Sequence, residues 1–169
     1  IIGLQDFSIF LKTKVKDVIK TSKIGFTRTV NNLHNPLEIF ETDKRDFIFQ
    51  KNDKYLIKSG TWIVNSPLII NGDLKVLPNT KLLFTPESYL IVKGNLHSLG
   101  AEKSKVKFTA ESDTWKGLYV LGDGSSSIIT HTEFSSTSEL RDGILQLTGG
   151  VTFYNSNLSI SDSSFLNAK

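Results

Sequence analysis

Two residues of this chain have types and a spacing that could do acid–base chemistry, His131 and Asp162. The segments 126–134 and 157–165 align at a step of 31 positions, which puts the histidine and the aspartate at the same position of each segment. If the two segments lie side by side, the carboxylate meets the imidazole and poises it as a general base. The alternative, which we favour, is a solvated surface pair that contributes little.

Three aromatic residues could instead bind a ligand. Trp115 and Tyr119 are four positions apart, before and within one expected strand, and Tyr89 lies in the preceding repeat. Aromatic rings exposed along one face of a protein form platforms on which sugar rings can lie, because apolar ring faces meet the C–H groups of the sugar. The alternative is that Trp115 closes a turn and Tyr119 shields the interior.

The elements that would position these residues repeat along the chain. Gly72 and Gly94 are 22 positions apart, and the same step links apolar pairs, namely Leu68 with Leu90, Ile70 with Val92 and Leu74 with Leu96. The step then lengthens: Leu82 and Phe84 match Val106 and Phe108 at 24, Leu90 and Val92 match Leu118 and Val120 at 28, and Ile129 and Phe134 match Ile160 and Phe165 at 31. Repeats of this size, made of short alternating strands, are typical of stacked solenoids. Residues 47–169 are therefore predicted to form an all-β fold, a parallel β-helix of about five coils.

The first 46 residues do not follow this repeat. Apolar residues recur there at steps of three or four, with lysines between them, at Leu4, Phe7, Leu11, Val15 and Val18. This spacing predicts an amphipathic helix over about 4–20. A solenoid needs an element that covers its first coil, so we expect a capping helix and an irregular lead-in over 1–46, followed by the β-helix over 47–169. A basic helix on a membrane surface is the alternative.

Composition limits the classes of function. The net charge of +3 is too small to indicate a dedicated nucleic-acid binder. Cysteine is absent, which excludes disulfides and thiolate metal sites, and no apolar run is long enough to span a membrane. The chain has no methionine, begins at Ile1 and stops at Lys169, just after an expected strand. We therefore expect a piece of a longer protein that is truncated within its β-helix. The coils expected beyond Lys169 would then pack on the last coil of this piece and be its partner.

One stretch resembles a known family. Leu74-Lys75-Val76-Leu77-Pro78-Asn79-Thr80-Lys81-Leu82-Leu83-Phe84 is similar to the coil motif L-x-I-x-P-G-T-x-L-x-F of the right-handed parallel β-helix repeat proteins, the pectin-lyase-like superfamily. Asn79 stands where that motif has glycine. Residues 148–154 and 158–165 look like coils of bacterial surface or secreted β-helix proteins of unknown role. The resemblance implies a right-handed helix and an extracytoplasmic, carbohydrate-rich setting (secreted, periplasmic or on the cell surface).

The resemblance also implies where catalytic groups would lie. Lyases of this fold cluster acidic calcium ligands on one sheet face, and hydrolases stack aspartates as general acid and base. No two of the acidic residues considered fall at matching positions of adjacent coils, these residues being Glu111, Asp113, Asp123, Glu133, Glu139, Asp142 and Asp162. We therefore predict no catalytic, cofactor-binding or metal-binding residue within this chain.

The leading hypothesis is a non-catalytic surface or secreted module, a rigid scaffold that binds a polysaccharide or cell-surface glycan. An alternative is the N-terminal fragment of a polysaccharide lyase or glycoside hydrolase whose catalytic coils lie beyond Lys169. Calcium is expected only in that case, and no other cofactor is implied. A weaker alternative is a segment of a phage tailspike-like fibre, which would be a trimer in solution.

Overall fold

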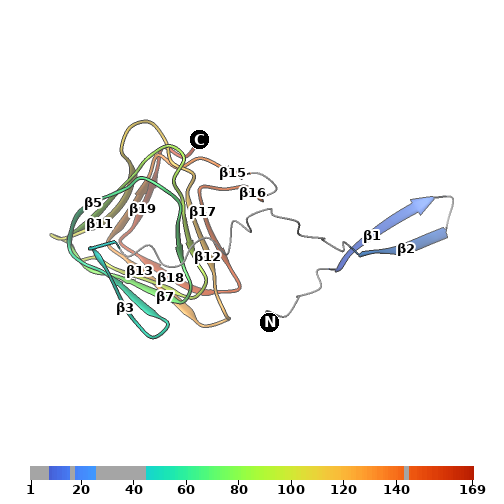
Figure 1. Cartoon of the computed structure of the whole chain (residues 1–169), viewed down its shortest axis with the longest axis horizontal. Coiled ribbons are helices and arrows are strands. Elements are labelled where there is room, and N and C mark those ends of the chain that lie inside the picture. Colours follow the sequence, from blue (N-terminus) through green and yellow to red (C-terminus); the bar gives the residue numbers. More distant parts are fainter. Residues whose placement is uncertain (1–7, 16–17, 26–44, 143–144) are drawn as a thin grey trace. The chain divides into compact units, whose positions relative to one another are not determined.

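The computed structural model describes residues 8–15, 18–25, 45–142 and 145–169 (Figure 1). The chain divides into two compact units, Ile1–Ile39 and Phe40–Lys169. Every regular element in the described residues is a β-strand, so the predicted all-β class is confirmed there. The predicted domain boundary between residues 46 and 47 stays a prediction.

The described part of the first unit is an antiparallel hairpin of β1 (Ser8–Val15) and β2 (Val18–Gly25). The capping helix predicted over 4–20 is therefore wrong where the structure describes the chain, and positions 4–7 and 16–17 lie outside the described residues. The sequence alternates Ile9, Leu11, Thr13 and Val15 as well as repeating at three and four. β-branched residues favour strands over helices, and here they decide between the two periods.

The second unit contains three sheets whose strands are parallel, except for one antiparallel pair. Sheet 1 has, in spatial order, β18 (Asn157–Ser161), β13 (Ser126–Thr130), β10 (Leu96–Leu99), β7 (Asp73–Val76), β4 (Lys54–Ile57) and the antiparallel β3 (Ile48–Lys51). Sheet 2 has β19 (Ser164–Leu166), β14 (Thr132–Ser135), β11 (Val106–Ala110), β8 (Thr80–Phe84) and β5 (Gly60–Val64). Sheet 3 has β17 (Val151–Tyr154), β12 (Leu118–Leu121), β9 (Leu90–Val92) and β6 (Leu68–Ile70).

From β4 onward the chain visits sheets 1, 2 and 3 in the same order again and again, and the sheets enclose a common interior (Figure 1). We call three consecutive strands, one from each sheet, a rung. Two strands interrupt the order between β14 and β17 and pair antiparallel with each other outside the three sheets, namely β15 (Leu140–Asp142) and β16 (Leu145–Leu147). Each rung therefore adds one strand to the edge of every sheet.

The register confirms most of the pairs expected from the repeat. Paired residues include Leu68 with Leu90, Leu74 with Leu96, Leu90 with Leu118, Ile129 with Ile160 and Phe134 with Phe165. The expected pairing of Leu82 with Val106 is wrong, because Leu82 pairs with Phe108. Ser98 pairs with Val76 at a step of 22, and Lys107 pairs with Lys81 at a step of 26. The connection between β10 and β11 is therefore four residues longer than the connection between β7 and β8, and the step at Leu82 is 26 and not 24. A strand has a side-chain period of two, and a shift of two residues keeps the same face inward.

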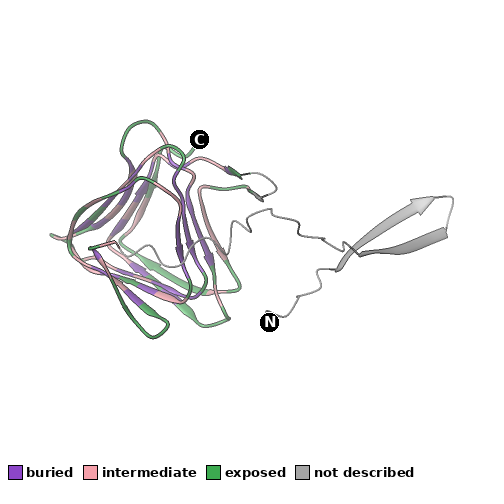
Figure 2. Ribbon diagram, in the orientation of Figure 1, coloured by how far each residue is buried: buried purple, intermediate pink, exposed green. Residues whose placement is uncertain are grey.

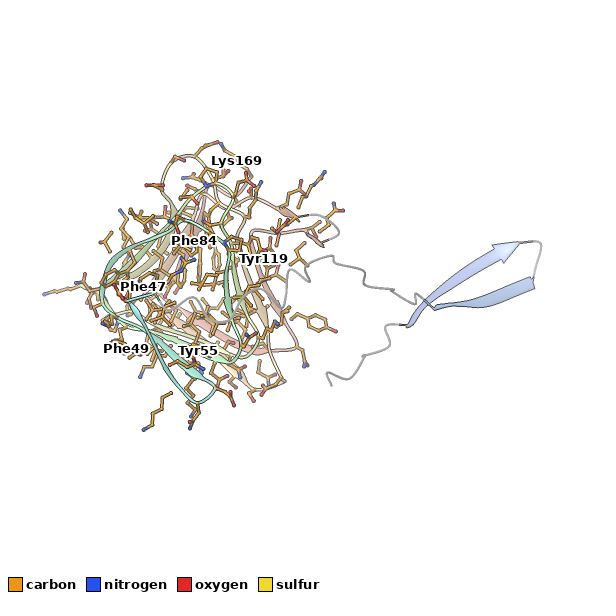
Figure 3. All side chains as sticks on the ribbon, viewed as in Figure 1. Phe47, Phe49, Tyr55, Phe84, Tyr119 and Lys169 are labelled. Atoms are coloured by element: carbon orange, nitrogen blue, oxygen red, sulfur yellow. The ribbon has the colours of Figure 1, made fainter. Side chains whose placement is uncertain are left out.

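Alternate strand residues fill the interior, and buried positions follow the walls that face it (Figure 2). Phe84 points inward, whereas Phe49 lies on the outside (Figure 3). At the first rung, Phe47 stacks on Trp62 with ring centroids 5.3 Å apart, and Trp62 packs against the core. Asn79 has a φ of 59°, a left-handed conformation that asparagine tolerates better than most residues, which explains how it replaces glycine in the coil motif.

Candidate functional site

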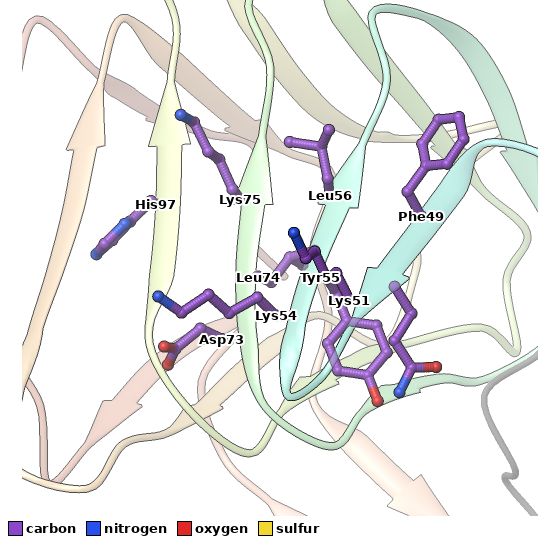
Figure 4. Close-up of a pocket in the computed structure, with 10 residues that line it drawn as sticks. Phe49, Lys51, Lys54, Tyr55, Leu56, Asp73, Leu74, Lys75 and His97 are labelled. Carbon is purple, nitrogen blue, oxygen red and sulfur yellow. The ribbon is translucent and has the colours of Figure 1, made fainter.

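A pocket of about 530 Å³ opens on the outward face of sheet 1, across β3, β4, β7 and β10 (Figure 4). Its outward-facing lining is both basic and apolar, and we call it the basic pocket, made of Phe49, Lys51, Lys54, Leu56, Asp73, Lys75 and His97. Gln50 and the buried residues Tyr55 and Leu74 complete the lining. The volume is within the usual range for sites of small ligands.

Strand alternation puts these side chains outside. Tyr55 and Leu74 are anchored in the core, so their neighbours Lys54, Leu56 and Lys75 must face the opposite side of the sheet. The register then aligns a row across four neighbouring strands, Phe49, Leu56, Lys75 and His97. Figure 4 shows the first three of these side by side. Neighbouring strands lie about 4.8 Å apart, so the row forms one continuous surface.

The pocket has a net positive charge, because three lysines line it against the single carboxylate of Asp73. Within the described residues, no ion pair is formed by Lys51, Lys54 or Lys75. The lone carboxylate in the lining, Asp73, accepts hydrogen bonds at Oδ1 from the backbone N–H of Asn95 at 2.9 Å and from its side-chain amide at 3.2 Å. An anion entering this pocket would therefore meet lysines that no described carboxylate holds in an ion pair.

Two contacts orient the ends of the row. The ammonium group of Lys58 lies 3.9 Å from the centroid of the Phe49 ring, a cation–π contact that holds the ring while leaving the side chain 51% exposed. At the other end, Nε2 of His97 lies 3.0 Å from the carbonyl oxygen of Ser126. A carbonyl can only accept, so Nε2 carries the proton, and Nδ1 of a neutral ring is left as an acceptor for a ligand hydroxyl.

Trp115 lies in the core and not on the surface. Its side chain is 0% exposed, its ring stacks on Phe84 at 3.9 Å, and Nε1 donates a hydrogen bond to the carbonyl of Ser135 at 2.9 Å. A sugar platform needs exposed ring faces, and this ring has none. The prediction of a carbohydrate contact at Trp115 therefore fails in its geometry, because the side chain fills the interior between the sheets.

Tyr89 and Tyr119 are also buried, at 2% and 1% exposure, but on the outward side of sheet 3. They form a second apolar cluster with Ile69, Ile91 and Leu140, and Leu147 packs against it. The hairpin of β15 and β16 covers this face, and Tyr89 donates a hydrogen bond to Asp142 at 3.1 Å. The insertion that follows β14, with strands β15 and β16, therefore covers the face on which Tyr89 and Tyr119 were expected to form a platform. The repeat pattern alone predicts that this face is open to solvent.

Burial raises the pKa of both tyrosines to about 12 from 10.0. The unfolded chain then ionises first as the pH rises, so the contribution of the two tyrosines to the free energy of unfolding should be constant below pH 10 and fall between pH 10 and 12. We expect the double variant Tyr89→Phe/Tyr119→Phe to lose less stability over this interval. Urea unfolding at each pH measures the difference, and lysine titration is common to both proteins. Parallel curves for the two proteins would contradict the assignment.

The structure brings His131 and Asp162 together. They follow the paired residues Thr130 and Ser161, and Nε2 of His131 lies 3.8 Å from Oδ2 of Asp162. Both backbones are left-handed, with φ values of 42° and 49°. The imidazole is 29% and the carboxylate 64% exposed, which fits the solvated surface pair better than a poised base.

Acidic residues elsewhere show one perturbed group. The backbone N–H of Ser125 hydrogen-bonds the carboxylate of Asp123 and, with the side-chain amide of Asn95, lowers the pKa of that carboxyl to about 2. Across the part of the chain that the structure describes, no group of three or more His, Asp or Glu side chains could hold a metal ion. In the same residues, no helix has the length and apolar character needed to cross a bilayer.

The basic pocket was not predicted from the sequence. A signal was present, because Lys54, Leu56, Lys75 and His97 occupy the outward positions between residues expected to face the core. Listing the outward residues rung by rung would have found the row.

Comparison with known proteins gives no match: no family model, no curated protein and no solved structure is significantly similar to this chain. The resemblance of the coil motif to the pectin-lyase-like superfamily therefore stays an interpretation of the sequence.

Proposed function

We propose that the second unit is a right-handed parallel β-helix that serves as a rigid, non-catalytic scaffold and binds carbohydrate in the basic pocket. Three parallel sheets visited in a constant order support the β-helix. Connections between parallel strands of one sheet are right-handed in nearly all proteins, which supports the handedness. Secretion or display on a cell surface is part of the same proposal and rests on the resemblance of the coil motif.

The observation that carries the binding proposal is the exposed Phe49 ring at one end of a concave, cationic row. Sugar rings present C–H groups on one face and hydroxyls at their edges. The Phe49 ring and Leu56 offer apolar contact, while the lysines and His97 offer hydrogen bonds to hydroxyls. Because β4, β7 and β10, which form most of the pocket wall, are held in ladders on both sides, that part of the pocket is preformed and little ordering entropy is lost there on binding.

We expect Phe49→Ala to weaken polysaccharide binding about tenfold, because an aromatic stacking contact contributes about 1.4 kcal/mol. The measurement is retention of the full 169-residue chain on immobilised polysaccharides, neutral and charged. Ile63→Ala is the matched control, since Ile63 is also an exposed apolar residue, 54% accessible, but lies on sheet 2. Equal losses in the two variants, or binding to no polysaccharide, would refute the proposed site.

A further inference from the structure

We infer that the ligand of the basic pocket is an anionic polysaccharide, carrying carboxylate or sulfate groups, and that Lys54 and Lys75 contact those groups directly. This inference rests on the proposed function and specifies its ligand class. The apolar and hydrogen-bonding contacts described above would suit any sugar. The arrangement of charge in the pocket is what separates a charged polysaccharide from a neutral one.

The first step of the argument is charge. Lys51 and Lys54 are a directly paired couple on β3 and β4, and Lys75 lies in the adjacent row between Leu56 and His97. All three lysines are exposed and form no ion pair within the described residues; Asp73 is the register partner of Lys54, but its Oδ1 accepts two hydrogen bonds from Asn95. Like charges held side by side repel each other, and an anionic ligand removes that repulsion as well as forming its own contacts.

The second step concerns the kind of polymer. β4 and β7 are paired on both sides, so their backbone groups are used in the sheet, and among the described strands of the pocket only β3 has a free edge, at the rim. An extended peptide binds mainly by pairing its backbone with a free strand edge, which the face of a sheet does not offer. A polysaccharide has no such need, because its hydroxyl and acidic groups bond to side chains. The side chains on this face therefore suit a polysaccharide better than an acidic peptide.

The third step concerns how the acidic groups are held. A bridging calcium ion would need six to eight oxygen ligands, and Asp73 is the single carboxylate of the lining. Both hydrogen bonds that Asn95 donates to Asp73 keep that carboxylate engaged. Lysine ammonium groups, with three donors each, can contact carboxylate or sulfate oxygens without an intermediate ion.

Three polymers with the same backbone test the inference: dextran, carboxymethyl-dextran and dextran sulfate. We expect the full chain to bind the two charged polymers at least about tenfold more tightly than dextran, with an affinity that falls as salt is raised and does not change with EDTA. The double variant Lys54→Gln/Lys75→Gln should weaken binding of the charged polymers by about tenfold. The control Lys103→Gln/Lys105→Gln removes the same charge from exposed lysines outside the pocket and should change it by less than about twofold. Thermal unfolding followed by circular dichroism verifies that both variants are folded.

The outcomes separate this inference from the proposed function. Equal binding of dextran and its charged derivatives, reduced by Phe49→Ala, would overturn the anionic class and leave the glycan-binding function standing. No binding of any polysaccharide would overturn both. Equal binding of polyglutamate, equal losses in the two lysine variants, or loss of binding in EDTA would each contradict direct recognition of an acidic polysaccharide. The ratio between the carboxylated and the sulfated polymer identifies the preferred group.

Discussion

A Gly94→Ala variant should lose about 3 kcal/mol or more of its free energy of unfolding. Gly94 lies between β9 and β10, where one rung passes directly over the previous one. A Cβ atom at this position would lie 2.6 Å from the carbonyl carbon of Gly72 and 2.8 Å from the backbone nitrogen of Asp73. These neighbours are backbone atoms of the adjacent rung, and they can move only if the ladders on both sides move with them. Urea unfolding followed by circular dichroism gives the loss.

Gly124→Ala is the matched control. Gly124 has a φ of +93°, so alanine there is strained, but nothing lies within 4 Å of its added Cβ. We expect a loss of about 1 kcal/mol, due to backbone strain alone. A Gly94 variant as stable as the Gly124 variant would show that the two rungs are not in close contact at this corner.

A Trp115→Ala variant should lose about 4 kcal/mol, because truncating a buried aromatic side chain removes its packing and leaves a cavity. Trp115 stacks on Phe84 in the interior that also holds the stacked rings of Phe108 and Phe134, whose centroids are 4.9 Å apart. Trp115→Phe keeps an aromatic ring but leaves the Ser135 carbonyl without the indole donor, and should lose about 1–2 kcal/mol. Urea unfolding of the two variants measures both losses.

Tyr154→Ala provides the comparison, since Tyr154 is 69% exposed and its loss should change stability by less than about 0.5 kcal/mol. The alternative role for Trp115, a surface contact for sugar, predicts the opposite pattern. A Trp115→Ala variant that keeps wild-type stability and loses binding to polysaccharides would reverse the assignment made here.

The stacking register could be predicted wherever both the repeat step and the residue types agree. Leu68 and Leu90 are each followed by a glycine four positions later, and apolar residues flank both in the same pattern. Their pairing could therefore be predicted from the repeat, and the register confirms it. Leu82 could not be matched correctly, because a longer connection precedes β11 and an alternating strand looks the same after a shift of two residues. Sites on the surface were harder to predict than the register. The period of two identifies which side chains point outward, but it does not show which of them another segment covers.

The burial of Tyr89 and Tyr119 illustrates that limit. Both occupy outward positions of sheet 3, and the hairpin of β15 and β16, which lies outside the repeat, covers them. Tertiary contacts of an insertion leave no periodic signal in a sequence. The first unit shows a related limit, because a short segment can satisfy a period of three to four and a period of two at once, and β-branched residues then favour the strand.

One measurement tests most directly the claim that neighbouring rungs lie in parallel register and together build the row of the basic pocket. The chain has no cysteine, so a double variant Lys75→Cys/His97→Cys contains a single pair of thiols. These residues are direct partners on β7 and β10, and neighbouring strands are about 4.8 Å apart, within the Cα separation that a disulfide spans. The pair Lys75→Cys/Ile128→Cys adds one further strand to the separation and serves as the control. Under mild oxidation, mass spectrometry should show an intramolecular disulfide in the first variant and free thiols in the second. Free thiols in the first variant, or equal cross-linking in both, would contradict the register on which the pocket and its proposed ligand depend.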